Sequence, residues 1–490
     1  MDLSRATLST LPTAIARPGY DPAMVRAGIV HLGFGGFHRA HMARYTHDLM
    51  ERRGDAAGWG IIGIGLRAGD VGVHDALAPQ DALYTLVERQ DGDETAVVIG
   101  SVCRVIQAAA SAKAVLDAID DPAIRIVSLT VTQNGYCLNA ATKLLDLDHP
   151  AILHDLAHPA QPLSAVGIIV EACRRRMAAG LPAFTAMSCD NIQHNGRVLR
   201  GAVLALAGRR DAALTDWIAA NASFPGTMVD RITPVTTPAM AADFAARSGL
   251  ADRWPVFCEH FRQWVIEDDF TAGRPAWEEA GAQFVADVAP YEFMKLRLLN
   301  TSHLAVAGLG RLLGHIHIDE TMRDPALRCY MRALMDRETG PTLPPVPGID
   351  LDAYKDQLIR RFGNVAIKDT VDRVNADAPI NLLVEPIGDR LAAGAGVDLL
   401  ALALAAWMRR LTGVDEAGRP IEVVHPLAGL LRERACAGGG DPVPLLGIRP
   451  LFGDLVGHEA FVATLRTWLT SLHVHGARTT LSHARARLGF

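Results

Sequence analysis

The chain lacks the features that mark several specialised classes of protein. Its seven cysteines are scattered without a C-x-x-C pair, so neither a disulfide framework nor a structural zinc site is expected. No apolar run approaches the roughly 18 residues that cross a bilayer, and the N-terminus has no long apolar stretch. We therefore expect no membrane span and no signal peptide, and the cytoplasm is the expected compartment.

The chain also lacks an excess of basic residues. Lys and Arg number 48 against 54 Asp and Glu, which gives a net charge of −6 and no general attraction to nucleic acid. The one tight basic run, Arg174-Arg175-Arg176, is interpreted as a helix end whose charges match the helix dipole. No nucleic-acid partner is therefore expected, and the sequence leaves the oligomeric state open.

What remains is an ordinary globular composition, with 490 residues, 49% hydrophobic and 21% charged. This length allows two or three domains, each with a core of its own. Residues 27–32 form an apolar run typical of a buried strand, and a glycine-rich turn and a helical stretch through Met50 follow. A strand, a glycine-rich turn and a helix start can bind a pyrophosphate through backbone N–H groups.

The glycine-rich turn matches the dinucleotide-binding fingerprint only in part. Gly33 and Gly35 fit G-x-G, but Gly36 follows directly, and residues 37–39 (Phe37, His38 and Arg39) occupy the region of the third glycine. The context strengthens the motif, because residues 59–66 predict a second parallel strand. Asp70 just beyond it is the candidate for binding the ribose of NAD. Asp70 could instead cap a helix, and Arg67 could meet the 2′-phosphate of NADP.

Further strands end in polar residues, where ligands gather in an open parallel sheet. Residues 124–132 predict a buried strand that brings Thr130 to the cofactor, and residues 184–188 lead to Asn191. Asn191 could also serve as a helix cap or turn residue. Residues 226–234 are strand-like and hold Asp230. Alternating strands and helices predict a Rossmann-like, doubly wound α/β domain over residues 1–285.

The rest of the chain, residues 286–490, is expected to form a mainly α-helical domain. Its first helix, residues 290–304, begins at Pro290 and carries Lys295, Asn300 and His303. At about 100° per residue, Asn300 and His303 lie roughly 140° and 80° round from Lys295, within one half of the helix. Lysine among apolar neighbours can act as a base near neutral pH. The alternative is an amphipathic core helix. Further helices are expected at residues 325–335, 351–362, 367–374, 393–412 and 426–434.

Several motifs, in the same order along nearly the whole chain, resemble those of the polyol-specific long-chain dehydrogenases. They are Gly33-Phe34-Gly35-Gly36-Phe37-His38-Arg39-Ala40-His41, Ser188-Cys189-Asp190-Asn191, Val229-Asp230-Arg231-Ile232-Thr233-Pro234, Lys295 with Asn300 and His303, Val346-Pro347-Gly348-Ile349-Asp350-Leu351, and Thr479-Thr480-Leu481. The resemblance implies metal-independent hydride transfer between NAD(H) and a sugar polyol or its ketose, with mannitol and fructose as the leading pair.

The resemblance also implies a role for each matching residue. Lys295 would be the general base and Glu292 its proton relay, Asn191 and Asn300 would hold the developing alkoxide, and His303 would orient the substrate. The substrate contacts it implies are Asp230, Arg373 and Asn381, and the cofactor contacts are Gly33, Gly35, Gly36, Phe37, His38, Arg39, Asp70, Thr130, Val229 and Asp230.

Three positions depart from the family pattern. Gly69-Asp70 stands where two acids are frequent, which leaves NADP open as a cofactor. Gln133 replaces a frequent glutamate, so Glu292 would relay protons alone. Asn381 replaces a substrate lysine, which favours a different polyol such as arabinitol. Two further alternatives are a hexuronate (fructuronate-type) reductase, for which Arg373 is the one obvious cation, and a nucleotide-binding protein without catalysis.

Overall fold

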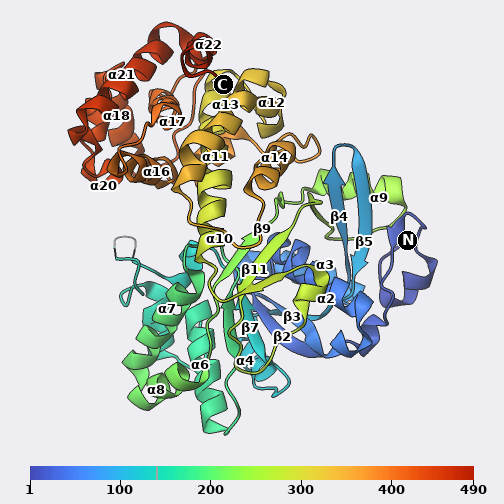
Figure 1. Ribbon diagram of the computed structural model, residues 1–490. Helices are drawn as coiled ribbons and strands as arrows, with labels where there is room; N and C mark the ends of the chain where they lie inside the picture. The colour runs from blue at the N-terminus through green and yellow to red at the C-terminus, as the bar shows by residue number, and fades with distance from the viewer. Residues whose placement is uncertain (140–141) are drawn as a thin grey trace. The chain divides into compact units, whose positions relative to one another are not determined.

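The apolar runs of the first half assemble into a parallel sheet with the strand order β6-β3-β2-β7-β8. The strands are β2 (Ala27–Leu32), β3 (Gly60–Gly65), β6 (Val102–Gln107), β7 (Ile126–Leu129) and β8 (Thr185–Ser188). The strand order reverses between β2 and β7, which makes the carboxyl ends of these two strands the topological switch point. The Rossmann-like prediction is confirmed. Figure 1 draws the computed structural model, which describes residues 1–139 and 142–490.

Both faces of this sheet are covered by helices, which is why its strands are apolar without alternation. Val30 and Leu32 of β2 belong to the core formed with α4 (Ala112–Ile119), α6 (Ala165–Ala178) and α7 (Asn195–Arg210). On the other face, Ile29, Ile61 and Ile126 share a core with α2 (Met42–Arg52). The sheet is therefore enclosed on both sides, and its functional groups are confined to the strand ends.

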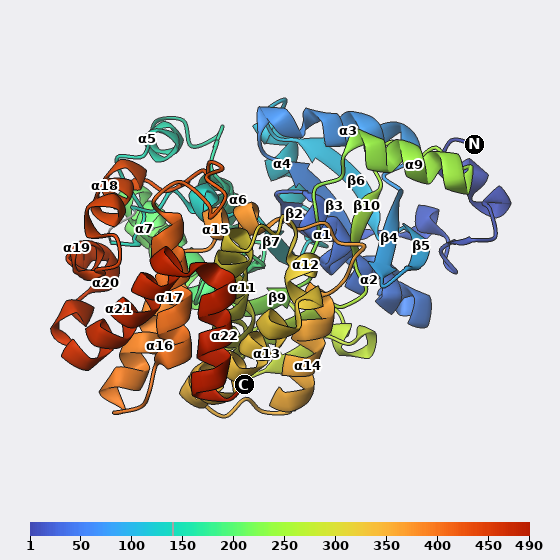
Figure 2. The same cartoon turned by 90° about the horizontal axis from the view of Figure 1, so that it is seen from above.

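Two smaller sheets complete this part of the chain. The hairpin of β4 (Tyr84–Gln90) and β5 (Asp93–Ile99) pairs antiparallel, with β1 (Ile15–Ala16) and β10 (Val256–Glu259) at its edges. Helix α9 (Pro238–Ser248) packs on this sheet (Figure 2). Phe244 of α9 lies edge-on to Phe257 of β10. The third sheet has the order β12-β11-β9, made of β9 (Thr227–Asp230), β11 (Gln263–Glu267) and β12 (Gln283–Val285). Asp230 thus ends a strand outside the parallel sheet.

The arginine run at the end of α6 has a structural role. Arg174 pairs with Glu171, and Arg175 pairs with Asp117 at 2.8 Å. Arg176 is buried and donates hydrogen bonds to the carbonyl oxygens of Ile119, Asp121, Ile124 and Pro182. These bonds join the end of α4 to the segments that lead into β7 and β8, so the arginine run stabilises the fold.

The second compact unit, Pro290–Phe490, is mainly helical, and the first covers Met1–Ala289. Helix α17 (Asp398–Arg410) carries an unbroken buried run from Leu399 to Met408 and shares one core with α11 (Thr301–Leu312) and α21 (Glu459–Val474). The other helices include α10 (Ala289–Met294), α12 (Ile318–Arg323), α13 (Pro325–Leu334), α14 (Leu351–Phe362), α15 (Val371–Asp377), α16 (Asn381–Ala392), α18 (Ala428–Gly438) and α22 (Gly476–Leu488). Among the described residues, no helix combines the length and the apolar character needed to span a bilayer.

A buried carboxylate caps the N-terminus of α17. The N–H groups of Leu399 and Leu400 donate to the two carboxylate oxygens of Glu338 at 2.9 and 2.7 Å. Glu338 lies in a π-helical turn, Met335–Thr339, and is only 5% exposed. Burial raises its pKa to about 7, although the two N–H groups act in the opposite direction.

Candidate active site

The glycine-rich turn after β2 requires glycine for two separate reasons. Gly33 has φ +90°, and a Cβ there would lie 2.1 Å from the carbonyl oxygen of Thr130. Gly35 and Gly36 are different, because the nearest contact of a Cβ beyond the chain neighbours would be at 3.9 Å for Gly35 and at 3.8 Å for Gly36. Their missing side chains leave space beside the backbone, as an approaching pyrophosphate requires.

A stacked histidine pair occupies the place of the third glycine. His38, in α1 (Gly36–Ala40), stacks on His31 of β2 with ring centroids 3.5 Å apart. His31 is held by Ser128 Oγ and Thr130 Oγ1, both at 2.8 Å. Burial lowers the pKa of His31 to about 3 and that of His38 well below its usual value, so both rings are neutral. Two flat neutral rings thus join helix to strand where a glycine would otherwise allow close packing.

The other side chains of this segment also point into the protein. Arg39 is buried, donates to the carbonyl oxygen of Trp254 at 2.8 Å and lies over the Tyr84 ring. Phe37 stacks on His41 with ring centroids 5.0 Å apart. A cofactor contact from His38 or Arg39 would therefore come from their backbone.

The turn after β3 is held together by Asp70. One carboxylate oxygen accepts the N–H groups of Leu66 and Arg67 at 3.0 and 2.9 Å. The other accepts a hydrogen bond from the Arg67 guanidinium at 3.2 Å. Asp70 thus has a local structural role, but its side chain makes no cap hydrogen bond to α3 (Val71–Leu77), the helix that it precedes, and its contact with a ribose stays a prediction.

The loop after β7 is fixed by Asp190, whose role the sequence did not reveal. Its carboxylate accepts the N–H groups of Val131 and Thr132 at 3.1 and 2.7 Å and the hydroxyl of Tyr136 at 2.8 Å. Thr132 has φ +61°, a strained value for a β-branched residue, which the two N–H bonds hold in place. Burial raises the pKa of Asp190, despite these three donors. The exposed Asn191 follows directly.

The loop after β7 also meets the glycine-rich turn. Thr130 Oγ1 donates to the carbonyl oxygen of Gly33 at 2.9 Å and bonds His31 through the same oxygen. Gln133 begins the short 3-10 helix Gln133–Tyr136 that follows the strained Thr132. The carboxyl ends of β2 and β7 are therefore linked directly at the switch point.

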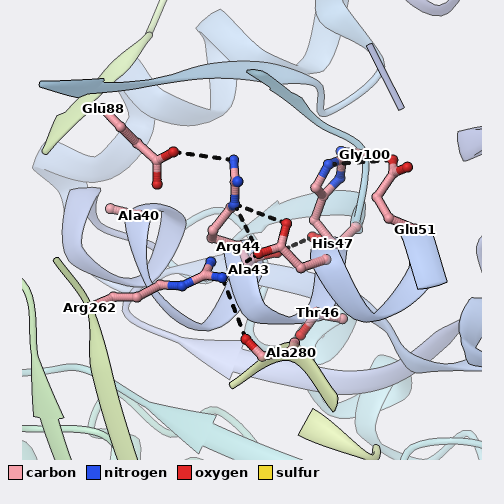
Figure 3. A network of polar contacts seen from close by, with 12 residues as sticks. Ala40, Ala43, Arg44, Thr46, His47, Glu51, Glu88, Gly100, Arg262 and Ala280 are labelled. Atoms are coloured by element: carbon pink, nitrogen blue, oxygen red, sulfur yellow. Dashed lines mark hydrogen bonds and ion pairs between the residues drawn. The ribbon is translucent and has the colours of Figure 1, made fainter. Parts of the chain in front are cut away.

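Asp230 and Val229 are buried at the end of β9, and the buried Arg231 follows them directly. Arg231 donates to the carbonyl oxygens of Ala40 and Glu259 and to the Glu88 carboxylate. Figure 3 shows the adjoining network on α2, in which Arg44 faces Glu88 with 3.6 Å between Nη1 and Oε2. These bonds fix the end of β9 to α1 and β4.

In the second unit, the predicted helix from Pro290 is interrupted by one wide turn. Residues Lys295–Asn300 form a π-helical segment, in which the Thr301 N–H donates to the carbonyl oxygen of Leu296, five residues earlier. The angle of 140° between Lys295 and Asn300 assumed a regular α-helix, and that assumption was wrong. The i→i+5 bonding brings side chains five apart toward the same face. Lys295 is 9% exposed, and Glu292 is also buried.

His303 and Arg373 share a carboxylate. Asp369 Oδ2 lies 3.8 Å from His303 Nε2, and Asp369 Oδ1 accepts a hydrogen bond from Arg373 Nε at 2.6 Å. Asp369 was not among the predicted site residues, although its position four residues before Arg373 is a recognisable pairing signal. The Phe362 ring lies against the His303 ring, with ring centroids 4.4 Å apart and a tilt of 30°. This arrangement fixes the imidazole, and it also places Arg373 next to it.

Asn381 begins α16 and is exposed, with its amide donating to Glu385 Oε1 at 2.9 Å. Its contact with a substrate stays a prediction. Within residues 1–139 and 142–490, no three His, Cys, Asp or Glu side chains are grouped so that they could hold a metal ion.

Comparison with known proteins matches two family models to this chain. The mannitol dehydrogenase Rossmann domain matches residues 27–279, and the mannitol dehydrogenase C-terminal domain matches residues 287–473. The D-mannonate oxidoreductase of Escherichia coli strain K12 is 44% identical over 96% of this chain and 98% of its own. A mannitol 2-dehydrogenase of Aspergillus fumigatus is 41% identical over 93% of each chain.

Solved structures agree with these matches. The mannitol 2-dehydrogenase of Pseudomonas fluorescens, in a ternary complex with NAD and D-mannitol, has a TM-score of 0.88 and is 44% identical, covering 99% of this chain and 100% of its own. The substrate-free crystal structure of a D-sorbitol dehydrogenase has a TM-score of 0.91 at 36% identity, covering 98% and 100%.

Proposed function

This chain belongs to the mannitol dehydrogenase family, and from that premise we propose that it transfers a hydride between NAD(H) and a sugar polyol or its ketose, with D-mannitol and D-fructose as the pair. The observation that carries the proposal is the helix with Glu292, Lys295, Asn300 and His303, whose π-helical turn draws Lys295 and Asn300 toward one face. On one face, a base can remove a hydroxyl proton while an amide donates a hydrogen bond to the oxygen that gains negative charge.

The residues of the first unit fit NAD. The open space at Gly35 and Gly36 would receive the pyrophosphate, and the linked ends of β2 and β7 would border the nicotinamide half. Thr130, Val229, Asp230 and Asp70 are the remaining candidate contacts. When bound, NAD supplies the acceptor for the hydride that leaves the substrate carbon.

The chain's own residues would handle the proton and the oxygen. Lys295 Nζ would take the hydroxyl proton, and Glu292, one helical turn earlier, would pass it on toward solvent. By the family resemblance, the amide groups of Asn300 and Asn191 would donate hydrogen bonds to the oxygen as it gains negative charge. His303, fixed by Asp369 and Phe362, would hold a neighbouring hydroxyl.

The charges around Arg373 favour a neutral sugar. Its guanidinium is paired with Asp369 and, at 3.1 Å, with Asp377, so its positive charge is already balanced. A hexuronate would bring a carboxylate that needs a cation of its own. The 44% identity to a D-mannonate oxidoreductase nevertheless makes a fructuronate-type reductase the second candidate. Lys368, whose ammonium lies 3.5 Å from the Asp319 carboxylate, is a further cation near Arg373 in the sequence.

The test of the reaction replaces Lys295 by alanine and follows NADH formation from D-mannitol. We expect kcat to fall about 10²- to 10⁴-fold, the usual contribution of a general base, with NADH affinity unchanged. Lys355→Ala is the matched control, because Lys355 is similarly buried in the same unit and pairs with Asp336. Undiminished turnover of Lys295→Ala near neutral pH would refute the lysine-base mechanism.

The test of the substrate compares kcat/KM for D-fructose and D-fructuronate, and for D-mannitol, D-arabinitol and D-sorbitol in the oxidative direction. A preference for fructose and mannitol supports the proposal, and a preference for fructuronate replaces it by the second candidate. NAD binding without turnover of any of these substrates would instead support a nucleotide-binding protein that lacks catalysis.

A further inference from the structure

Two sheet edges of the first unit lie side by side close to Asn191. β8 is an edge strand of the five-stranded sheet and ends three residues before Asn191, whereas β9 is an edge strand of the three-stranded sheet and ends in Asp230. The N–H of Ala186 donates to the carbonyl oxygen of Ser223 at 2.9 Å, which places the segment that leads into β9 alongside β8. The two strand ends with candidate site residues therefore belong to separate sheets that need a connection.

Asn195, the first residue of α7, makes this connection with its side chain. Its amide nitrogen donates to the carbonyl oxygen of Thr227 at 2.8 Å, and its amide oxygen accepts the Thr227 N–H at 3.0 Å. An amide that donates to and accepts from one backbone residue reproduces the pairing of a neighbouring strand. Thr227 Oγ1 donates in turn to the carbonyl oxygen of Ser188, the last residue of β8, at 2.6 Å. Asn195 and Thr227 thus join the two sheets.

The same amide nitrogen fixes the peptide bond that leads into Asn191. It donates to the carbonyl oxygen of Asp190 at 3.0 Å, and this oxygen also accepts the N–H of Ile192 at 2.9 Å. The carboxylate of Asp190 holds the loop after β7, as described for the site. Asp190 is therefore held through its side chain and its main chain, and Asn195 supplies the main-chain contact from α7.

Asn195 is itself placed without freedom to move. Its side chain is fully buried. A Cβ on the next residue, Gly196, would lie 2.4 Å from the carbonyl oxygen of Phe224 and 2.7 Å from the nitrogen of Gly226, so α7 begins in direct contact with the segment before β9. His194, the residue before, has φ +55°, which is uncommon for a residue other than glycine. The start of α7 is therefore held in one position.

From these contacts we propose that Asn195 is a positioning residue for the hydride transfer. It holds the backbone from which the Asn191 amide reaches the oxygen that gains negative charge, and it fixes the start of the strand that ends in Asp230. The inference rests on the proposed function, because Asn191 has such an oxygen to bind only if the chain catalyses this reaction. Asn195 acts on the rate through Asn191.

The experiment is a double-mutant cycle with Asn191 in the full chain. Asn195→Asp keeps the size of the side chain and, when ionised, lacks the donor, and Asn195→Ala removes both the donor and the acceptor. Each is combined with Asn191→Ala. The kcat and KM are measured with the substrate that the wild type turns over best among D-mannitol, D-arabinitol, D-sorbitol, D-fructose and D-fructuronate, and NADH affinity is measured by fluorescence titration.

Gln80→Ala is the matched control. Gln80 is a buried amide of the same unit, and it also donates to one backbone segment and accepts from another. It should lower the melting temperature and leave kcat within about twofold, because its effect is on stability alone.

We expect both Asn195 variants to lower kcat about 10- to 100-fold. A donor displaced by about 1 Å loses much of the roughly 10²- to 10³-fold that an oxyanion contact contributes. KM and the NADH dissociation constant should change less than about threefold, because the contact forms mainly in the transition state. In the Asn191→Ala background the same substitutions should lower kcat less than about threefold, since the amide that Asn195 positions is absent.

Two results would overturn the positioning role. One is a loss of kcat that is equally large with and without the Asn191 side chain, and the other is an unchanged kcat in folded Asn195 variants. If Asn195→Ala does not fold, Asn195→Asp, which preserves the shape of the side chain, decides between these results. Both leave the proposed function standing, because the wild type still turns over its substrate. A wild type without turnover of any substrate in the panel would overturn the proposed function together with the positioning role.

Discussion

Glu338 should make the stability of the helical unit depend on pH in a direction opposite to that of most carboxylates. Its carboxylate caps α17 while buried, and burial raises its pKa from 4.5 to about 7. A folded-state pKa above the unfolded value contributes stability that is complete below pH 4.5 and is lost as the pH rises through 7. Glu338→Gln, which cannot ionise, should lack this loss.

The magnitude follows from the two pKa values. A difference of about 2.5 pH units, at about 1.36 kcal/mol for each, amounts to about 3 kcal/mol over the whole range. Between pH 5 and 8 the expected change is about 2.5 kcal/mol, because part of the transition lies below pH 5. Glutamine accepts only one of the two N–H groups well, so the variant also carries a penalty of about 1–3 kcal/mol at every pH.

The assay is urea unfolding of both proteins from pH 5 to 8, with Glu385→Gln as a control for an exposed glutamate in the same unit. Hydrogen exchange of the segment that starts α17 locates the effect. The free energy of unfolding of the wild type, relative to that of Glu338→Gln, should fall steadily across this range. Parallel pH profiles for the two proteins would refute the reasoning.

Two further predictions concern the first unit. Gly33→Ala combines a positive φ with a clash against the Thr130 carbonyl oxygen, so it should cost about 2–5 kcal/mol of stability and weaken NADH binding. Gly54→Ala, at an open position, should change neither the stability nor the NADH affinity. Thermal unfolding and NADH titration measure the two effects, and equal behaviour of the two variants would contradict the role of Gly33. Asp190→Asn should release the strained Thr132 backbone and cost about 1–3 kcal/mol of stability, seen as a lower melting temperature. The NADH dissociation constant should rise about tenfold, which corresponds to about 1.4 kcal/mol of binding free energy. NADH affinity equal to that of the wild type would show that the loop does not border the cofactor.

The sequence predicted the parallel sheet well because its strands are short apolar runs enclosed on both faces. The runs at β2, β3, β7 and β8 needed no tertiary information. The strands within residues 254–284 were missed. β10 is the edge strand of one small sheet, whereas β11 is the middle strand of another, and its pairing with β9 and β12 is one that no local pattern encodes.

The details of the candidate site depended on contacts between distant residues. The link from His303 to Asp369 spans 66 positions, and the bonds from Asp190 reach back to Val131 and Thr132. The stack of His31 on His38 replaced a glycine that the fingerprint led us to expect. In each case a buried polar group had to find a partner, and a linear pattern does not say which one it finds.

The π-helical turn at Lys295–Asn300 makes this part of the chain sensitive to length as well as to residue identity. Such a turn holds one residue more than the α-helical turn it replaces. Loss of one residue, for example Leu298, would restore regular i→i+4 bonding and leave a helix with better hydrogen bonds. Lys295 and Asn300 would then be four positions apart, about 40° round a regular helix from one another, and so would still face the same side. Insertion of one residue between them would instead turn Asn300 by about 100° away from Lys295, so this segment tolerates a deletion better than an insertion.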